Sequence, residues 1–589
     1  MAGNDRGVRR RTLLGGMASS AGLPVAAPAR AQSDERPSSG AEKPHIAVFS
    51  GPTATIQNSP PLVTASQGGD RSFQSMRPQR LAAPVVVYVE QFSAHPLERD
   101  ARDLYGPPDG WIVEGRFTET EPAPGRGVPV HRVELRPSDG LYLLPYVSRQ
   151  RDGSAWEGPG VTPTAPAAQT RQTFYPDAHR IYEEIDRFAI GREGQSNLLS
   201  AQATFDFFRA VPSGGYTRGL AAGDRTDMGE GNTPPERLGT DFFPYAPRHL
   251  RAEPEGAHLA MATNMVQSVL SRGGYVGAQW LEGSPTVEET LYWLNLLIDT
   301  PVPIVGHSAQ RAHGLIGSDG DRNILDGVEY IVSQVWADER GRDRLGAVLI
   351  VDEVVFAARE VTKVDARPGG YAATGGHGGV VASMGGKGPP LLSYVPVRRH
   401  THNSEFRLPL LPGRVPGVRR ERGGRCAPTS VLTKDMSGLR PDAMPYIAMT
   451  KYVRWARPAD GSGEEDAAIL EQLDLNLRTA PLSGFVAEGA SPSGRMNPAT
   501  DRALAIAVFC GVPVVRCGRG NTAGYALDED PYSVSAHNLT ATKARLLLMA
   551  CLLKLGALPP AADPRRPTAA EQAAARDKIA AYQALFESH

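Results

Sequence analysis

The chain of 589 residues is poor in cysteine and has no cysteine pair with metal-binding spacing. Its four cysteines are Cys426, Cys510, Cys517 and Cys551, and no two of them form a CxxC motif. The sequence therefore offers no support for a zinc site or a dithiol redox motif. Cys510 and Cys517 flank an expected strand at 512–515, where an oxidising compartment would allow a bridge between them. Buried free thiols are an equally good interpretation.

The chain also lacks an excess of charge and, beyond its N-terminus, any long apolar run. Lys and Arg number 63 against 64 for Asp and Glu, so the net charge is -1. Such a balance creates no field that would attract nucleic acid or an anionic membrane. No later segment has the roughly 18 consecutive apolar residues that a transmembrane helix needs. We expect neither nucleic acid nor a membrane as a partner of the mature chain. Internal repeats are absent as well.

The residues that are abundant indicate a large protein with many turns. The chain contains 63 glycines and 50 prolines, and 41% of its residues are hydrophobic. Glycine and proline at these levels favour loops over long helical bundles. The length is too great for one ordinary domain and predicts two or three.

The N-terminus has the features of an export signal. Arg9, Arg10 and Arg11 precede a short, glycine-containing apolar stretch, and an A-x-A cleavage site follows at 29–31. We interpret residues 1–31 as a twin-arginine signal, which predicts a periplasmic or secreted protein. A disordered tail is the alternative. Residues 32–43 have the composition of a flexible leader.

Short apolar strands alternate with amphipathic helices along much of the mature chain. This alternation predicts an α/β fold, with a mostly parallel sheet in an N-terminal domain and a smaller C-terminal α/β domain. The expected strands are 45–49, 84–90, 275–280, 302–305, 345–351, 446–453, 484–488 and 512–515, and the expected helices are 258–271, 286–297, 323–333, 467–477, 498–509 and 540–555. The predicted parts are an N-terminal domain at 44–385 with an insertion of low periodicity at about 60–255, a linker at 386–440, a C-terminal domain at 441–560 and a surface tail at 561–589.

Ligands bind open parallel sheets beyond the carboxyl ends of the strands, and two loops with hydroxyl groups follow such strands. The first loop is 50–55, where a threonine hydroxyl is a candidate nucleophile. The second is 282–290, where Ser284 and Thr286 precede a helix. Lys363 is a third candidate, as a proton acceptor if it is buried beside a hydroxyl. The plain interpretations are a turn, a capped helix N-terminus and a solvated surface lysine.

Taken in chain order, these segments resemble the bacterial asparaginase/glutaminase family. That family has a GGT(I) loop after strand one, then HGTDTMEET, VGAMRP with SADGPxNL, and RDVTK. Here the series is SGPTATI at 50–56, EGSPTVEET at 282–290, VGHSAQR and GSDGDRNILD at 305–326, and REVTK at 359–363. The series continues in the second half of the chain with VRRHT at 397–401 and GFVAEGASPSG at 484–494, which are similar to the family's RKHT and GIVxAGxGNGN. It ends with VPVVRCGR at 512–519 and LTATKARLLLMACL at 539–552, which are similar to VVRSSR and LNPQKARVLLQLAL. The resemblance spans about 44–56 and 258–556 and leaves residues 60–255 uncovered.

The resemblance implies an asparaginase-like fold and an amidohydrolase mechanism. A threonine of the first loop, Thr53 or with a shifted alignment Thr55, would attack a side-chain amide, with backbone N–H groups stabilising the oxyanion. Ser284 would supply the second hydroxyl, and Lys363 would act as the proton acceptor. The implied substrate-binding positions are Glu282, Gly283, Pro285, His307, Asp528 and Glu529. The resemblance further implies a small amide substrate, a homo-oligomer, and no metal or organic cofactor.

The sequence departs from the family where the substrate's α-amino group would bind. Pro285 stands in place of the family's aspartate, and Glu282 in place of its histidine. Losing one charged hydrogen bond costs roughly 1.5–3 kcal/mol, which predicts an altered substrate preference. The alternative is a catalytically inactive ligand-binding protein on the same fold, because fold alone does not determine function.

Overall fold

In a computed structural model of the protein, the chain divides into two compact units, Met1–Glu42 and Lys43–His589. The structure describes residues 42–51, 61–63, 84–89, 108–114, 116–135, 141–143, 148–149, 181–182, 185–186, 189–191, 194–195, 197–210, 256–284, 286–311, 317, 319–374, 377–385, 388–422, 424–454, 465–491, 494–520 and 530–589. The predicted signal at 1–31 lies outside these residues. So do five of the candidate site residues, Thr53, Thr55, Pro285, Asp528 and Glu529.

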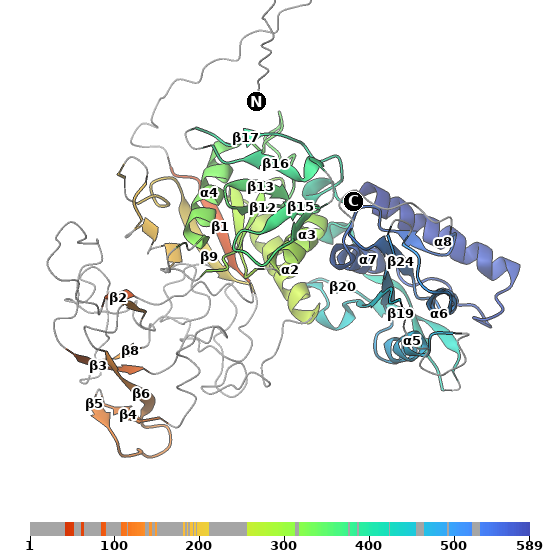
Figure 1. The fold of residues 1–589 in the computed structure, drawn as a ribbon, viewed down its shortest axis with the longest axis horizontal. Helices are drawn as coiled ribbons and strands as arrows, with labels where there is room; N and C mark the ends of the chain where they lie inside the picture. The colour runs from red at the N-terminus through yellow and green to blue at the C-terminus, as the bar shows by residue number, and fades with distance from the viewer. Residues whose placement is uncertain are drawn as a thin grey trace, which may run out of the picture. The chain divides into compact units, whose positions relative to one another are not determined.

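An eight-stranded sheet forms the centre of the N-terminal part, as predicted (Figure 1). Its order is β17-β16-β13-β12-β11-β10-β1-β9, and β12, β11, β10, β1 and β9 run parallel. The bounds are β1 His45–Ser50, β9 Thr204–Arg209, β10 Gly277–Leu281, β11 Ile304–His307, β12 Val348–Val351, β13 Val354–Ala357, β16 Val380–Ser383 and β17 Leu391–Leu392. All four residues of β12 are buried, as expected for a strand covered on both faces.

Helices cover the two faces of this sheet separately. The helices α2 (Gly256–Ser271) and α3 (Val287–Leu297) contribute Val266 and Leu291 to one buried cluster. The helix α4 (Gly320–Ser333) contributes Val328 to the cluster on the other face. These helices match the predicted ones to within a few residues, because their apolar positions repeat with helical spacing.

The region from 60 to 255 supplies one strand of the main sheet. β9 pairs in parallel with β1, from His45 opposite Thr204 to Ser50 opposite Arg209. The same region holds a five-stranded sheet of order β5-β4-β6-β3-β8, whose buried residues include Tyr88, Ile112 and Val130. Its strands, and the separate pair β2–β7, are β2 Pro61–Val63, β3 Val85–Val89, β4 Gly110–Val113, β5 Arg116–Thr118, β6 Val128–Leu135, β7 Leu141–Leu143 and β8 Ser148–Arg149.

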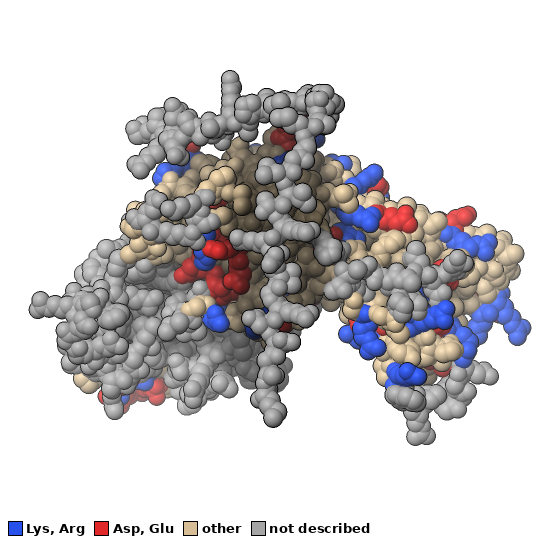
Figure 2. Space-filling view, turned by 45° about the horizontal axis from the view of Figure 1, so that its top comes forward, with Lys and Arg blue, Asp and Glu red and all other residues tan. Residues whose placement is uncertain are grey.

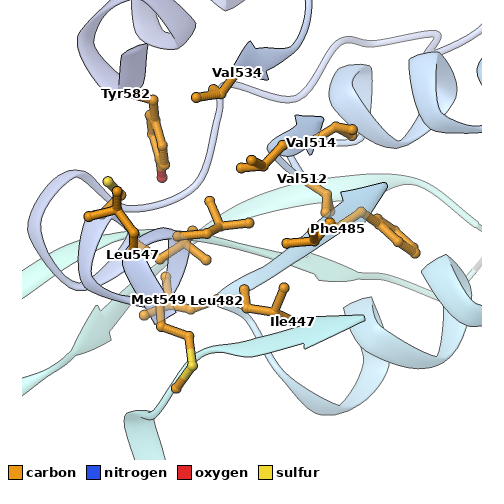
Figure 3. Packing of buried hydrophobic residues seen from close by; sticks show 14 of the residues in the cluster. Ile447, Leu482, Phe485, Val512, Val514, Val534, Leu547, Met549 and Tyr582 are labelled. Carbon is orange, nitrogen blue, oxygen red and sulfur yellow. The ribbon is translucent and has the colours of Figure 1, made fainter. Parts of the chain in front are cut away.

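The C-terminal part contains a second, smaller parallel sheet. Its order is β22-β23-β24-β25. Figure 3 shows Phe485 of β23, Val514 of β24 and Leu547 of α7 among the side chains of the core that fills this part. The bounds are β22 Tyr446–Lys451, α5 Ala467–Thr479, β23 Ser483–Gly489, α6 Pro498–Phe509, β24 Val514–Gly518, β25 Val534–Ser535, α7 Ala541–Leu555 and α8 Ala569–Ser588.

Two segments with loop-like composition pack onto this C-terminal core. Residues 386–440 include the hairpin β18 (Arg414–Arg420) and β19 (Cys426–Leu432), and Val418 is buried in the same cluster as the sheet. Residues 561–589 include α8, whose Tyr582 and Phe586 are fully buried. The shorter elements of the C-terminal half are η7 Thr401–Asn403, η8 Leu408–Leu410, β20 Lys434–Asp435, β21 Gly438–Leu439 and η9 Pro441–Ala443.

All four cysteines are buried free thiols. Cys510 lies beside Cys426 and hydrogen-bonds to it, whereas the Cys517 thiol donates to the Ala487 carbonyl at 3.8 Å. The possible bridge between Cys510 and Cys517 is therefore not formed, and the free-thiol interpretation holds for this structure.

Within the described part of the chain, no helix is long and apolar enough to cross a bilayer. Nor do the described His, Cys, Asp and Glu residues form a group of three or more that is placed to hold a metal ion. On the face drawn in Figure 2, acidic side chains gather in a patch near the centre of the view, and basic side chains predominate toward the right.

A buried lysine joins the two α/β parts where α7 packs against α3. Lys543 of α7 is 1% exposed, and its Nζ donates to the Ala358 carbonyl. Burial lowers the pKa of Lys543 to about 8, an effect that the nearby carboxylates Glu288 and Glu360 oppose. Glu288 is itself 6% exposed, so each buried charge depends on the other.

We expect Lys543→Met to lower the free energy of unfolding by about 3 kcal/mol, because Glu288 would then be buried without its cation. Chemical denaturation at neutral pH measures this loss. The matched control is Arg545→Met, which breaks the more exposed pair of Arg545 and Glu289 (3.1 Å) between the same helices. Arg545→Met should lower the free energy of unfolding by at most about 1 kcal/mol. Equal losses in the two variants would contradict the role assigned to Lys543.

Candidate active site

The parallel strands bring three loops to one edge of the main sheet. Ser50, Leu281 and His307 lie side by side at the carboxyl ends of β1, β10 and β11. The backbone N–H of Gly51 donates to the Leu281 carbonyl at 2.8 Å, so the loop after β1 begins directly against the loop after β10. This edge is where ligands bind open parallel sheets.

Ser284 lies in the loop between β10 and α3 and accepts a hydrogen bond from a tyrosine. The Tyr371 hydroxyl donates to Ser284 Oγ at 2.9 Å and lies 3.4 Å from Ser308 Oγ. Burial raises the pKa of Tyr371, so its phenol stays protonated and remains a donor at neutral pH. Because Ser284 accepts this bond, its own O–H remains available to a substrate or to a neighbouring hydroxyl.

Lys363 lies on the other side of the same tyrosine. β14 (Val361–Lys363) and β15 (Tyr371–Ala373) form a two-stranded hairpin in which Lys363 is directly opposite Tyr371. Lys363 Nζ is 4.9 Å from the centre of the Tyr371 ring, and it donates to Gln310 Oε1 at 2.9 Å and to the Arg367 carbonyl at 2.5 Å. The structure thus brings Ser284 and Lys363 to the same tyrosine, with Ser284 at its hydroxyl and Lys363 over its ring. Among the described contacts, Ser284 and Lys363 make no direct hydrogen bond to each other.

The environment of Lys363 moves its pKa toward the range that a general base uses. Partial burial lowers the pKa, and the carboxylates Asp365, Asp319 and Glu288 oppose that effect. The backbone N–H of Lys363 donates to Glu288 Oε2 at 2.5 Å, which fixes the end of β14 against the first turn of α3. A lysine held in this way differs from a freely solvated surface lysine.

Glu282 and Gly283 shape the start of α3. Glu282 is 5% exposed and accepts a hydrogen bond from Trp280 Nε1 at 2.7 Å, and burial raises the pKa of its carboxyl group. The Gly283 carbonyl accepts from the Thr286 hydroxyl at 3.3 Å and from the Val287 N–H at 3.3 Å. Thr286 therefore bonds back to the loop, and its side chain does not cap the helix. That Glu282 and Gly283 bind substrate stays a prediction.

His307 lies on the α4 side of the sheet, within the core. Its ring is 3.0 Å from Gln279 Nε2, and a Cβ added to Gly327 of α4 would come within 2.2 Å of it. The next residue, Ser308, carries the contact with Tyr371 and accepts a hydrogen bond at its carbonyl from Asn323 Nδ2 at 2.8 Å. The structure thus places the His307 ring among core residues and Ser308 beside the other candidates. The substrate-binding role of His307 stays a prediction.

Sequence reasoning did not single out Tyr371, Ser308 or Gln310. Tyr371 follows the segment Arg367-Pro368-Gly369-Gly370, and Gly369 adopts a φ of +78° in the turn between β14 and β15. A Pro-Gly-Gly turn a few residues after Lys363 indicates a hairpin, and this was the available signal. Only the observed register places the tyrosine opposite the lysine.

An α/β sheet with hydroxyl groups and a lysine at its carboxyl edge is an arrangement in which small-molecule ligands commonly bind. Residues 254–371 match the family model described as Asparaginase, N-terminal. This segment of the chain is therefore asparaginase-like in sequence. The match covers α2 through the start of β15, which is the part that carries Ser284, Lys363 and Tyr371.

Individual relatives are similar at low identity. The glutaminase-asparaginase of Acinetobacter glutaminasificans is 27% identical over 162 residues, covering 27% of this chain and 46% of that protein. The L-asparaginase of Bacillus licheniformis is 32% identical over 161 residues, with the same coverage of 27% and 46%. The chain thus spans about half the length of these curated relatives. A probable cytoplasmic L-asparaginase from Campylobacter jejuni aligns in structure with a TM-score of 0.41 and 20% identity, covering 56% of this chain and 81% of that one.

Proposed function

We propose that the protein is an amidohydrolase that converts a small side-chain amide to the acid and ammonia. The observation that carries the proposal is the convergence of Ser284, Tyr371 and Lys363 at the carboxyl edge of the sheet. A hydroxyl and a lysine of lowered pKa are the groups that activation of a nucleophile requires. The asparaginase-like sequence of this region favours amide hydrolysis over other acyl transfers.

In the proposed reaction, a threonine of the loop after β1, Thr53 or Thr55, attacks the amide carbon. Lys363 in its neutral form accepts the threonine proton by way of the Ser284 hydroxyl, which Tyr371 orients. The tetrahedral oxyanion is stabilised by backbone N–H groups, and the leaving nitrogen takes a proton and departs as ammonia. Water then attacks the acyl-threonine, releasing the acid and restoring the threonine hydroxyl.

We expect the mature protein, without residues 1–31, to release ammonia from at least one compound in a panel of small amides. The panel is asparagine, glutamine and succinamic acid, which is asparagine without its α-amino group. Because Pro285 supplies no carboxylate, the preference for asparagine over succinamic acid should be at least ten-fold smaller than in an enzyme that has this aspartate. Coupled detection of ammonia under saturating amide measures the rates.

The same experiment decides against the proposal if a folded preparation releases no ammonia from any amide. Calorimetric binding of these amides without turnover would then support the inactive ligand-binding protein. We also propose, from the arginines at 9–11 and the cleavage site at 29–31, that a twin-arginine signal exports the protein and that it is periplasmic or secreted.

A further inference from the structure

A cavity of about 220 Å³ lies away from the candidate active site. Its lining residues come from two segments, with residues 338 and 342–344 in the loop between α4 and β12, and residues 396–400, 402 and 403 further along the chain. This loop enters β12 at its amino end, and the Asp343 N–H donates to the carbonyl of Pro301, just before β11, at 2.7 Å. The cavity therefore lies at the amino edge of the sheet, opposite to the edge that carries Ser284 and Lys363.

The cavity is lined by more positive than negative side chains. Four arginines line it, Arg342, Arg344, Arg398 and Arg399, against the two aspartates Asp338 and Asp343. Two of the arginines have acidic partners, since Arg342 pairs with Asp338 at 3.0 Å and Arg399 pairs with Glu405. The other two, Arg344 and Arg398, form no ion pair with a described residue and are the ones that an incoming anion would contact.

Arg344 and Arg398 have few partners of their own. Arg344 Nη2 donates to the Val335 carbonyl at 3.2 Å, while its buried Nε has no hydrogen-bond partner among the described residues. Arg398 makes neither a hydrogen bond nor an ion pair with any residue that the structure describes. Burial and the nearby Arg359 both lower the pKa of Arg398, against the opposing effect of Glu360 and Glu587. Each guanidinium therefore retains donors that no described residue satisfies.

The aspartate that is buried beneath the arginines does not neutralise them. Asp343 is fully buried, its Oδ1 accepts from the Leu345 N–H at 2.8 Å, and its Oδ2 has no hydrogen-bond partner within the described ranges. Burial raises the pKa of Asp343 to about 8, so its carboxyl group is mostly protonated at neutral pH. A protonated carboxyl group adds a further donor to the cavity.

Two histidines in the wall have lowered pKa values, mainly because they are buried. Burial lowers the pKa of His400 to about 4, and the neighbouring His402 lowers it further. Burial and then Arg342 lower the pKa of His402, whose buried Nδ1 has no hydrogen-bond partner in the described part of the chain. Their rings lie 6.0 Å apart, so both would respond to a charge that enters between the two segments.

We propose that this cavity binds a small phosphate-bearing ligand through Arg344 and Arg398. Guanidinium groups match the oxygens of a phosphate in pairs, and unsatisfied donors in a partly buried cavity strengthen such contacts. A doubly charged phosphate compensates two arginines, whereas a single carboxylate compensates one. The volume leaves room for a small organic group beside the phosphate. This inference does not depend on the amidohydrolase proposal, because no residue of that site lines the cavity.

The test is titration of the full mature chain with inorganic phosphate at constant ionic strength, using calorimetry and the imidazole NMR signals of His400 and His402. Phosphate should raise the pKa of both histidines, because a nearby anion favours their charged forms. Sulfate and succinate, run as parallel titrations, separate phosphate recognition from binding of any oxyanion or of a dicarboxylate.

Variants decide whether the arginines carry the binding. Arg398→Met and Arg344→Met should each weaken phosphate binding about ten-fold or more, the effect of losing a charged hydrogen bond. Arg340→Met, an exposed arginine in the same loop that does not line the cavity, is the matched control and should bind as the unmodified protein does. Arg398 has no described ion pair to lose, so its variant decides the matter even if Arg344→Met fails to fold.

Three results would overturn the proposal. The first is an unmodified protein that shows neither heat nor a histidine shift with phosphate. The second is an affinity that is the same in Arg398→Met as in Arg340→Met. The third is tighter binding of succinate than of phosphate, which would assign the cavity to a dicarboxylate.

Discussion

Replacing Lys363 with methionine is expected to reduce kcat for ammonia release by about 10² to 10⁴, the usual contribution of a positioned general base. Methionine keeps the length and apolar stem of the side chain but removes the amine that lies 4.9 Å from the Tyr371 ring. The KM should change much less, because the proposed role of the amine lies in proton transfer rather than in substrate binding. Steady-state kinetics on the best amide of the panel give both values.

The pH profile separates a base from a merely structural lysine. Lys363 accepts a proton only when neutral, so the rate should rise with pH toward its pKa, which lies below 10.5. The variant should lose this rising limb along with its activity. A profile that keeps its shape while the rate falls would instead assign Lys363 a structural role, through its bonds to Gln310 and Arg367.

Two matched variants complete this experiment. Lys578→Met removes an amine of α8 that donates to the Leu555 carbonyl at the end of α7, far along the chain from the site, and should leave kcat unchanged. Tyr371→Phe removes the hydroxyl that holds Ser284 but keeps the ring beside Lys363. It should lower kcat by about ten-fold, less than the lysine variant, because it disturbs orientation and leaves the base in place.

The second large effect is on stability in acid. Burial lowers the pKa of His307 to about 3 from an ordinary value of 6.5. The unfolded chain therefore binds a proton at this residue below about pH 6.5, while the folded chain does not until about pH 3. The contribution of neutral His307 to the free energy of unfolding is fully present above about pH 6.5 and is lost as the pH falls toward 3. The loss is about 1.4 kcal/mol per pH unit and about 5 kcal/mol in all.

The variant His307→Gln removes the titrating group and retains polar atoms beside Gln279. The free energy of unfolding of the unmodified protein, minus that of the variant, should fall by about 3 kcal/mol between pH 6.5 and pH 4. Taking this difference isolates His307 from His400 and His589, whose pKa values burial also lowers to about 4. Urea denaturation at several pH values measures it.

The control is His258→Gln, on a partly exposed position of α2. Its unfolding curves should run parallel to those of the unmodified protein across this pH range. Parallel behaviour of His307→Gln as well would contradict the burial of a neutral His307 in the sheet core.

The sequence predicted the regular α/β elements because their signals are local. The apolar residues of α3 recur with the spacing of a helix. Those of β12 form the unbroken apolar run that is typical of a buried strand. The order of the motifs along the chain also indicated the family. Ser284 and Lys363 became candidate site residues in this way, since each lies inside a recognisable motif.

Pairings between distant segments had no such local signal. β9 pairs with β1, which lies about 160 residues away in the sequence. The composition of the hairpin β18–β19 predicts a linker, because its charged and proline residues face solvent while Val415 and Val418 pack inward. Strand pairing depends on which surfaces remain to be buried once the rest of the chain has folded, and composition does not contain that information.

The site and the cavity show the same division. The sequence alone determined the fold class, the order of the elements and two of the residues that meet at the carboxyl edge. The tertiary structure decided that Tyr371 lies between those two residues, that His307 belongs to the core, and that Arg344 and Arg398, from separate segments, share one cavity. Local signals arise from neighbours along the chain, whereas hydrogen bonds, burial and pKa shifts arise from neighbours in space.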